Sequence, residues 1–535
     1  MQSGWGEGVV GNVGKWTLAL ALCGAACAKS RGADPEKPIV GAPDAGIPDP
    51  APVDAGTPDP APTAVRPVFG TSGPWAMGKT AGSPGWPSTT YGSADGIQES
   101  PVVGVSTDEP VLQPDGSISQ NLWVATNSAL YLLRPGDKKF TRFDGHDGLH
   151  LPGFPAASCD DASGTLKPCP NGEAAPPGIS EIVGGGSGEG YAGEVFVGYY
   201  GYHDWSRSDD GTWTDPWRHS GKLDRVRLKA DKSGTLAIEV IRFDMVSNAT
   251  VEFWHNKTVY KMVYDHFIHP HELYVGTDHG VTKFSPDKWK PNDPPPDNWF
   301  LGRNNAPVWM SDHLHPRACF HKICTDDSGL RLGGWRGLAI DATGDLWVAG
   351  RYAAGKIRYV ADNAEWWVTP RKDGMPAQTP SFGDPYEGNC SGNRPVFCVP
   401  EEGDYVNLSA VALTKDETVW FTSGVLFGQA GDVNYGIASW APRKPFTYYD
   451  PIRDAGMVEE NVRDMLALPD GRLVLAGPNS GLTVWEPATG KSTSIRAGQG
   501  LPDDRVLRIQ LDTMVDPPAL HVATRGGATV FRVLP

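Results

Sequence analysis

The chain has 535 residues and a formal net charge of −16 at pH 7, from 47 lysines and arginines against 63 aspartates and glutamates. This acidic balance, without any basic run, argues against a nucleic-acid partner, because phosphate binding needs clustered lysine and arginine. No apolar run reaches the ~18 residues that predict a transmembrane helix.

Residues 1–27 have the features of an export signal. Lys15 precedes an apolar stretch from Trp16 to Leu22, and small residues lead to Cys27. The segment resembles a bacterial lipoprotein signal, which implies lipidation of Cys27, although Gly24 stands where such signals usually have leucine. Ordinary secretion with cleavage after Ala28 is the alternative.

Residues 28–66 are expected to be a disordered linker. The Pro/Ala/Asp/Gly pattern of residues 43–52 is nearly repeated in residues 53–62, and such a composition cannot bury a core. At ~3.1 Å per residue in polyproline II form, it spans on the order of 100 Å. It resembles the spacers of Gram-negative lipoproteins, which implies an extracytoplasmic protein anchored to the cell envelope, with the outer membrane favoured.

Residues 67–535 contain one five-residue strand motif seven times, and the fourth residue of each copy is small. Seven copies of a strand-hairpin unit predict an all-β fold, a seven-bladed β-propeller. The small fourth residue of each copy suits a site where a neighbouring blade packs closely. The copies are Leu122–Thr126, Val195–Tyr199, Leu273–Thr277, Leu346–Gly350, Val419–Ser423, Leu473–Gly477 and Leu520–Thr524.

Alternating apolar and polar residues predict up to four strands in each blade. The last blade is one strand short at Pro535, so a strand from residues 66–71 or nearby is expected to complete it. The predicted strands are 102–105, 121–126, 129–133 and 140–143; 179–183, 194–199, 223–228 and 236–243; 259–267, 272–277, 280–284 and 299–301; 337–341, 345–350, 356–360 and 365–368; 408–413, 418–422, 437–440 and 446–449; 462–468, 472–476, 482–485 and 492–495; 506–511, 520–524 and 529–533.

Leu122 to Leu149, which ends in Asp147-Gly148-Leu149, resembles the two-component regulator propeller repeat. Related endings recur at residues 373–376, 455–457 and 500–502. The resemblance implies a β-propeller, and family members often form the periplasmic sensor of membrane kinases that respond to glycans. This chain shows no kinase segment, so the resemblance implies the propeller fold and not a role as a kinase sensor.

Six cysteines after Cys27 fall in three close pairs, which predict three local disulfides in an exported protein. Fifteen connectivities remain open. The pairs lie in long connections between blades, which a propeller places on one face together with the insertions 200–222 and 424–436. Function concentrates on long loops held by a rigid scaffold, although these disulfides could simply protect the insertions from proteases. The pairs are Cys159 and Cys169, Cys319 and Cys324, and Cys390 and Cys398.

The insertion 200–222 is rich in aromatic and polar residues. Sugars stack on such rings while their hydroxyls bind neighbouring carboxylates, so the insertion is a candidate ligand site. The alternative is that the rings pack under the loop as a small core. The candidate residues are Tyr200, Tyr202, His203, Trp205, Trp213 and Trp217.

Metal and catalytic signatures are weak. His313, His315 and His321 lie beside Cys319 but match no standard zinc spacing, and the paired aspartates match no EF-hand. The sequence contains no nucleophile elbow, H-E-x-x-H or phosphate-binding loop. No cofactor, metal ligand or catalytic residue is therefore assigned, and a divalent cation stays an open alternative.

The sequence favours a lipid-anchored, monomeric propeller that binds a glycan or an envelope protein through its looped face. Two alternatives remain: an exported lyase or hydrolase with a site in the central channel, and a scaffold of an envelope protein complex.

Lipidation gives the first testable prediction. Palmitate labelling of the protein in a Gram-negative host should disappear in Cys27→Ser, because the thiol is the acceptor. Labelling that persists in the variant would rule the anchor out.

Overall fold

The structure is a computed structural model, and it describes part of the chain. Residues 1–79, which include Cys27 and the linker, lie outside this part. The described residues are 80–81, 84–113, 115–151, 158–160, 166–168, 178–186, 192–200, 221–230, 236–247, 258–277, 281–284, 300–301, 307–311, 317–320, 323–324, 334–350, 353–357, 364–368, 396–398, 408–423, 436–441 and 447–535.

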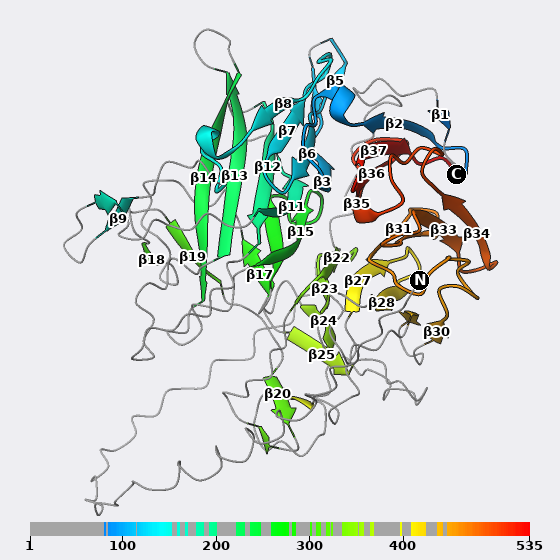
Figure 1. Cartoon of the computed structure of the whole chain (residues 1–535). Helices are drawn as coiled ribbons and strands as arrows, with labels where there is room; N and C mark the ends of the chain where they lie inside the picture. Colours follow the sequence, from blue (N-terminus) through cyan, green and yellow to red (C-terminus); the bar gives the residue numbers. More distant parts are fainter. Residues whose placement is uncertain are drawn as a thin grey trace, which may run out of the picture. The chain divides into compact units, whose positions relative to one another are not determined.

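Apart from two single 3-10 turns, η1 (Ser93–Asp95) and η2 (Gly145–Asp147), the regular structure of the described residues is entirely β. Short antiparallel strands follow one another along the chain in the sheets of Figure 1. The first three sheets are β3 (Val102–Thr107), β6 (Leu122–Thr126), β7 (Leu130–Leu133) and β8 (Thr141–Phe143); β11 (Ile179–Gly184), β12 (Glu194–Tyr199), β13 (Gly221–Ala230), β14 (Leu236–Ser247), β19 (Pro307–Ser311) and β18 (Phe300–Leu301); and β15 (Val259–Asp265), β16 (Glu272–Thr277) and β17 (Val281–Phe284).

The next four sheets complete the larger set. They are β22 (Gly337–Ile340), β23 (Leu346–Ala349), β24 (Ala353–Ile357) and β25 (Ala364–Val368); β27 (Leu408–Leu413), β28 (Val419–Ser423), β29 (Ile437–Trp440) and β30 (Thr447–Tyr449); β31 (Asp464–Ala467), β32 (Leu473–Ala476), β33 (Leu482–Glu486) and β34 (Lys491–Ile495); and β35 (Val506–Asp512), β36 (Ala519–Thr524), β37 (Gly527–Arg532), β2 (Pro87–Tyr91) and β1 (Thr80–Ala81).

Three small sheets lie in the connections. They are β4 (Val111–Leu112) with β5 (Ile118–Ser119); β9 (Ser158–Asp160) with β10 (Leu166–Pro168); and β20 (Arg317–Phe320) with β21 (Ile323–Cys324) and β26 (Val396–Cys398).

The first strand of each larger sheet, here called its inner strand, contacts the inner strand of the next sheet. The contacts run from β3 to β11, β15, β22, β27, β31 and β35, and β35 contacts β3 again. A closed cycle of antiparallel sheets joined through their inner strands is the topology of a β-propeller. Such a cycle leaves no inner strand without a neighbour.

One predicted strand belongs to a different sheet. Residues 299–301 were expected to form the outer strand of the third sheet. Phe300–Leu301 instead pairs with β19, and β19 pairs in parallel with β14 of the second sheet. The prediction was wrong because β14 runs from Leu236 to Ser247 and offers a long outer edge on which a later segment can pair.

The last sheet takes its outer strands from the N-terminal side of the chain. β2 pairs antiparallel with β37, from Ser88 opposite Phe531 to Tyr91 opposite Ala528. This strand lies further along the chain than the predicted residues 66–71, which are outside the described residues. Pairing between the two ends of the described chain covers an edge that would otherwise be open.

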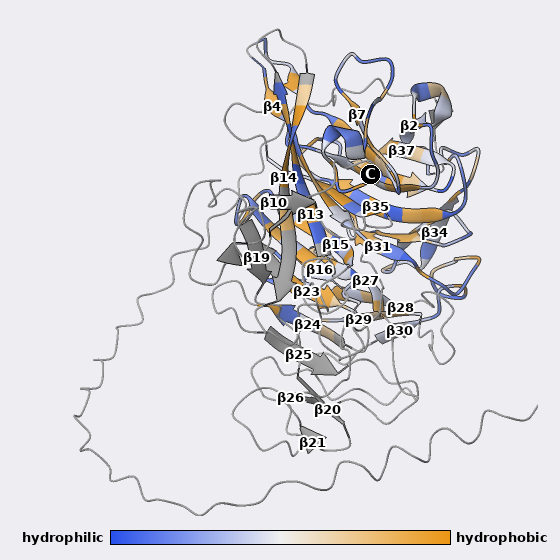
Figure 2. Ribbon diagram, turned by 60° about the vertical axis from the view of Figure 1, so that its left-hand side comes forward, coloured by the Kyte–Doolittle hydropathy of each residue, from blue (hydrophilic) through white to orange (hydrophobic). Residues whose placement is uncertain are grey.

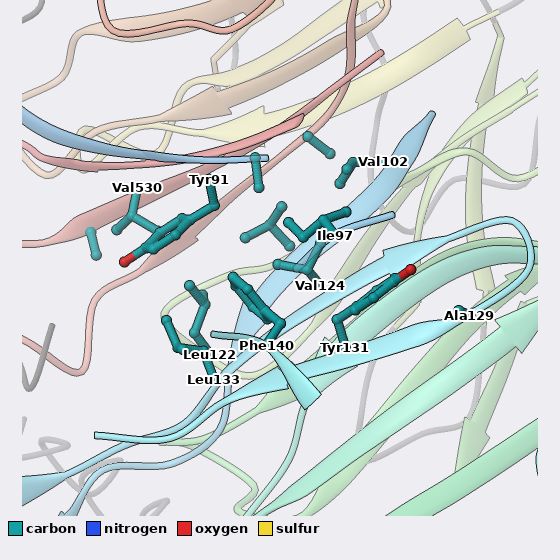
Figure 3. Close-up of a cluster of buried hydrophobic side chains, with 14 of the residues drawn as sticks. Tyr91, Ile97, Val102, Leu122, Val124, Ala129, Tyr131, Leu133, Phe140 and Val530 are labelled. Carbon is teal, nitrogen blue, oxygen red and sulfur yellow. The ribbon is translucent and has the colours of Figure 1, made fainter. Parts of the chain in front are cut away.

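Buried side chains join the first and last sheets (Figure 3). The ring of Tyr91, on β2, meets the ring of Phe140 edge to face, with centroids 5.4 Å apart. Val530 of β37 and Val124 of β6 belong to the same cluster. The rings and aliphatic groups exclude water from the seam, and burial of this apolar surface stabilises it.

A buried polar network spans the same pair of sheets. The hydroxyl of Thr107 donates to Asp512 over 2.8 Å, and Gln120 Nε2 donates to the same carboxylate over 2.7 Å. Burial raises the pKa of the neighbouring Asp108 to about 7, although Asn121 donates two hydrogen bonds to its carboxylate. The seam is thus held by directional contacts as well as by apolar packing.

Hydrophobic residues concentrate on the strands, whereas the turns between them are more hydrophilic (Figure 2). The repeated motif supplies much of the core: Trp123, Phe196, Val275 and Trp347 each expose at most 4 % of their surface. The strands of the motif are buried on both faces, as every residue of β6, β12 and β16 shows, and they are not alternately buried and exposed as a period-two pattern predicts, because each sheet packs between two neighbouring sheets.

The fourth residue of the motif lies where adjacent sheets approach each other closely. A Cβ at Gly198 would lie 2.4 Å from Val259 Cγ1, and one at Gly276 would lie 2.4 Å from the carbonyl oxygen of Trp335. Both distances are far shorter than real Cβ contacts. The expected clash of larger residues is therefore present in the geometry at these two positions.

Gly276→Ala should lower the free energy of unfolding by about 1–3 kcal/mol, as overpacking usually does. The obstacle is a backbone carbonyl, which cannot rotate away. Gly92→Ala is the matched control, because a Cβ there meets only Gly526 O, at 4.0 Å. Chemical denaturation measures both variants, and equal midpoints would contradict the close-packing account.

Candidate functional site

The inner strands carry chemically distinct residues at one equivalent position. In β3, β11, β15, β27 and β35 the pairing register shifts between the first and third residues of the strand. The third residue then pairs with the small fourth residue of the motif. Across the cycle, the residues that pair with this fourth residue are Gly104, Glu181, Lys261, Gly337, Ala410, Asp464 and Arg508.

Four of these equivalent residues are charged, and they interact across the cycle. Arg508 Nε lies 2.5 Å from Glu181 Oε2, and Lys261 Nζ lies 3.3 Å from Asp464 Oδ2. A second nitrogen of Arg508 lies 3.9 Å from the same Asp464 oxygen. Side chains from β11, β15, β31 and β35 therefore form one ionic cluster, which we call the central cluster.

Further hydrogen bonds fix the two carboxylates. Asp464 accepts from the backbone amides of Met465 and Ile509, over 3.0 and 3.1 Å. Gln510 donates to Glu181 Oε1 over 3.1 Å and to the carbonyl of Ile182 over 2.6 Å. Such bonds hold buried carboxylates in one orientation.

Burial dominates the electrostatics of this cluster. Glu181 is fully buried, and desolvation raises its pKa above the usual range, against the opposing effects of Arg508 and Lys261. Burial lowers the pKa of Arg508, but the charges of Glu181 and Asp464 outweigh it and the net shift is upward. In this low-dielectric setting each ion depends strongly on its partner.

Two more arginines and two tyrosines extend the cluster. Arg463 directly precedes Asp464, and electrostatic interactions link it to Arg508, Arg336 and Tyr200. The guanidinium of Arg336 lies over the ring of Tyr260, 4.5 Å from its centroid. Arg508 also donates to the carbonyl of Tyr260, over 2.7 Å.

The central cluster lies at the end of the sheets where the inner strands begin and where the long connections enter them. In each sheet the second strand is antiparallel to the inner strand, so the second strand ends beside the start of the inner strand. Ile179, which begins β11, is opposite Tyr199, which ends β12. The amide of Tyr200 donates to the carbonyl of Gly178 over 2.9 Å. The insertion that follows Tyr200 therefore begins next to the cluster.

Tyr200 is the one predicted ligand residue within the described part of the chain, and it lies at the central cluster. Tyr202, His203, Trp205, Trp213 and Trp217 are outside that part. The structure describes no cysteine side chain, so the three disulfides stay predictions. The histidines considered as metal ligands also lie outside the described residues: His313, His315 and His321.

The turn between β15 and β16, at the opposite end of the sheets, carries other histidines. His266 Nδ1 lies 2.9 Å from Glu109 Oε1, and His271 Nδ1 lies 2.8 Å from the hydroxyl of Tyr264. His269 lies 3.5 Å from Asp265. Within the described residues, no three His, Cys, Asp or Glu side chains are grouped to hold a metal ion.

The central cluster was not predicted from the sequence. Its members are isolated single charges in apolar strands, each separated from the next by 40 or more residues, with no local motif. A signal did exist: the residues expected opposite the small fourth residue of the seven motif copies are Gly, Glu, Lys, Gly, Ala, Asp and Arg. Four charges at a position that faces other blades needed an explanation.

Comparisons with known proteins give only distant likenesses. No protein-family model matches the sequence, and a search of curated proteins finds no match. The chain is similar to one chain in a crystal structure of the mitotic checkpoint complex, with 11 % identity, a TM-score of 0.41, and coverage of 94 % of this chain and 99 % of that one. It is also similar to a structure of YCF48 bound to a D1 peptide, with 9 % identity, a TM-score of 0.39, and coverage of 84 % and 97 %.

The β-propeller assignment accordingly rests on the strand topology, and the resemblance to the two-component regulator repeat stays a prediction. Among the described residues, no helix is long and apolar enough to span a membrane.

Arg508→Met should destabilise the protein by about 3–5 kcal/mol, because it leaves the Glu181 carboxylate buried without its cation. The double variant Glu181→Leu with Arg508→Met should recover much of that loss, since neither charge remains. Chemical denaturation of both single variants and the double variant gives the coupling energy. Additive losses would show that the pair is not coupled.

Proposed function

We propose that this protein is an extracytoplasmic, seven-bladed β-propeller that binds a glycan or protein ligand at the end of the sheets where the long connections join. The observation that supports this proposal best is the convergence of charged groups from four inner strands, with Tyr200 beside them, at that end. Each of the seven larger sheets would be one blade.

The central cluster would form the polar floor of the proposed site, and its preorganised side chains suit ligand binding. The buried carboxylates already have fixed partners, so little ordering remains to be done when a ligand arrives. The insertion 200–222 begins at this floor and carries five further aromatic or histidine candidates in its sequence. Aromatic rings around a few fixed polar groups are typical of ligand sites.

The cellular setting completes the proposal. A signal at residues 1–27 would direct export, lipidated Cys27 would anchor the chain to the cell envelope, and residues 28–66 would hold the propeller away from the membrane. Disulfides in the connections would stiffen the same face. The anchor, the location and the disulfides follow from sequence patterns alone.

An exported lyase or hydrolase is the second candidate, favoured by the buried ionisable groups in the central cluster. Elevation of the Glu181 pKa by burial is the kind of shift found at catalytic carboxyl groups. Structural ion pairs produce the same shift, and every described carboxylate of the cluster is engaged by a cation or amide. Binding therefore accounts for the geometry with fewer assumptions.

A glycan array probed with the purified full chain tests the binding function. The protein should bind a defined subset of glycans, and Trp205→Ala with Trp213→Ala should weaken that binding at least tenfold, because stacking area is lost. Leu112→Ala is the control, since Leu112 is 62 % exposed and lies in the connection from β3 to β6, at the opposite end of the sheets.

Absence of binding, or binding unchanged by both tryptophan substitutions, would contradict a sugar site in the insertion. Co-purified envelope proteins in place of glycans would indicate the protein ligand or the scaffold. Metal analysis and a turnover assay on the same preparation separate the enzyme alternative: stoichiometric metal with depolymerisation of a polysaccharide would overturn a purely binding role.

A further inference from the structure

The seam between the first and last sheets buries four ionisable side chains that the proposed ligand site does not use. Asp108 directly follows β3, whereas Asp512, His521 and Arg532 belong to β35, β36 and β37. Each of the four exposes at most 6 % of its surface. Charged side chains are rarely buried so completely unless they are paired, so the partners of these four decide what the group can do.

Strand register places three of these side chains on one face of the last sheet. Ala519 of β36 lies opposite Asp512 on one side and opposite Arg532 on the other. His521 is two residues beyond Ala519 and points to the same face, because alternate residues of a strand share a face. At the diagonal spacing of about 7–8 Å, long side chains of neighbouring strands can interact. His521 thus lies between an acidic and a basic residue of the two flanking strands.

This face of the last sheet is the one that packs against the first sheet. Ala519 belongs to the apolar cluster that joins the two sheets. Asp512 accepts hydrogen bonds from Thr107 and Gln120, and both bonds cross the seam. His521 is therefore enclosed between the two sheets at which the cycle closes.

The charged groups around His521 come from its own sheet and from the two sheets nearest to it in the seam. Gln510 lies directly opposite His521, and its amide donates to Glu181 of the central cluster. Arg508 precedes Gln510 by two residues on the same face. The titratable and charged groups that face His521 are Asp512, Arg532 and Arg508 of the last sheet, Asp108 of the first sheet and Glu181 of the second sheet.

Protonation of His521 would give this group more hydrogen-bond donors and more positive charge than it can accommodate. Among the described residues, His521 Nε2 and Arg532 Nη2 have no hydrogen-bond partner. The other terminal nitrogen of Arg532 donates to the carbonyl of Pro517 over 3.1 Å. A neutral imidazole can keep Nε2 as a bare acceptor, whereas a protonated one adds a buried N–H and a second cation beside the guanidinium.

The electrostatics agree with this geometry. Burial lowers the pKa of His521 to about 4, with Asp512 raising it and Arg532 lowering it. The unfolded chain takes up this proton near pH ~6.5, so the stability that His521 contributes is lost as the pH falls from about 6.5 to about 4. Asp108 has the opposite sign: burial raises its pKa to about 7, so the folded chain takes up that proton first and gains stability in acid.

We propose that His521 is the acid-sensitive group of this seam: the neutral imidazole allows the first and last sheets to pack, and its protonation separates them. β2 is the strand that responds first, because it is an outer strand of the last sheet and its Tyr91 packs across the seam on Phe140. This device does not depend on which ligand the proposed site binds.

Hydrogen–deuterium exchange of the full chain, read by mass spectrometry between pH ~7.5 and ~4.5, tests the inference. The protection factor of β2 in the parent protein, divided by that in His521→Leu, should fall by up to about tenfold per pH unit below pH ~6.5, because one proton distinguishes the two proteins. Asp108 is present in both, so its contribution cancels. A ratio that does not change with pH would overturn the inference.

Matched variants separate the charge of His521 from its packing. His521→Gln repeats the comparison with a polar, uncharged side chain and should give the same pH dependence as His521→Leu. His146→Leu, at a histidine whose side chain is 79 % exposed, should follow the parent protein. Asp108→Asn should lose protection more steeply in acid than the parent protein, because the group that opposes His521 is gone.

Strands away from the seam show where the opening occurs. β23 and β28 belong to the fourth and fifth sheets of the cycle, and their protection factors should keep a constant ratio between the parent protein and His521→Leu. An equal fall of this ratio in β2, β23 and β28 would indicate acid unfolding of the whole propeller and contradict an opening at the seam. An equal response of His146→Leu and His521→Leu would refute the assignment to His521.

Discussion

The guanidinium of Arg508 ties four inner strands together. It pairs with Glu181 of β11, donates to the carbonyl of Tyr260 of β15, and approaches Asp464 of β31 from its own strand β35. No two of these strands pair in one sheet, so backbone hydrogen bonds within the sheets do not connect them. The ionic cluster therefore adds directional contacts to the apolar packing between sheets.

This arrangement depends on the residue type at one equivalent position of the inner strands, which is small in some repeats and charged in others. Where the residue at this position is small, as at Gly104 and Gly337, neighbouring strands approach very closely: a Cβ at Gly104 would lie 2.7 Å from Ile182 Cγ1 on β11, and one at Gly337 would lie 2.7 Å from the amide nitrogen of Val411 on β27. Where the residue at this position is charged, its side chain reaches partners across the cycle. The residue type at this equivalent position therefore determines both how closely neighbouring inner strands pack and which charges the central cluster contains.

Buried ion pairs contribute little net stability compared with apolar packing of the same volume, because desolvation offsets most of the attraction. The role of these ion pairs is better explained by the fixed orientation that they give to the carboxylates. Carboxylates that accept backbone amide and amide side-chain bonds present fixed charges at the end of the sheets where Tyr200 and the long connections lie. A binding site with such a floor needs little reorganisation.

Local pattern alone determined much of this protein. Period-two alternation and the recurring motif are properties of neighbouring residues, and they predicted the all-β class and most strands of the seven larger sheets. β1, β2, β19 and the strands of the three small sheets were not predicted. The small fourth residue likewise indicated close packing between repeats. Tyr200 was chosen as a candidate from the aromatic composition of its insertion, and its role as a ligand residue stays a prediction.

Tertiary structure decided what depends on contacts between distant residues. Phe300–Leu301 joined the second sheet because β14 offers an outer edge, and the N-terminal strand that was expected to complete the last sheet is β2, further along the chain than residues 66–71. Glu181, Lys261, Asp464 and Arg508 became one cluster only when the cycle closed. Single charges spread along the chain carry no local signature, since their pairing energy depends on distance and burial, which only the folded chain defines.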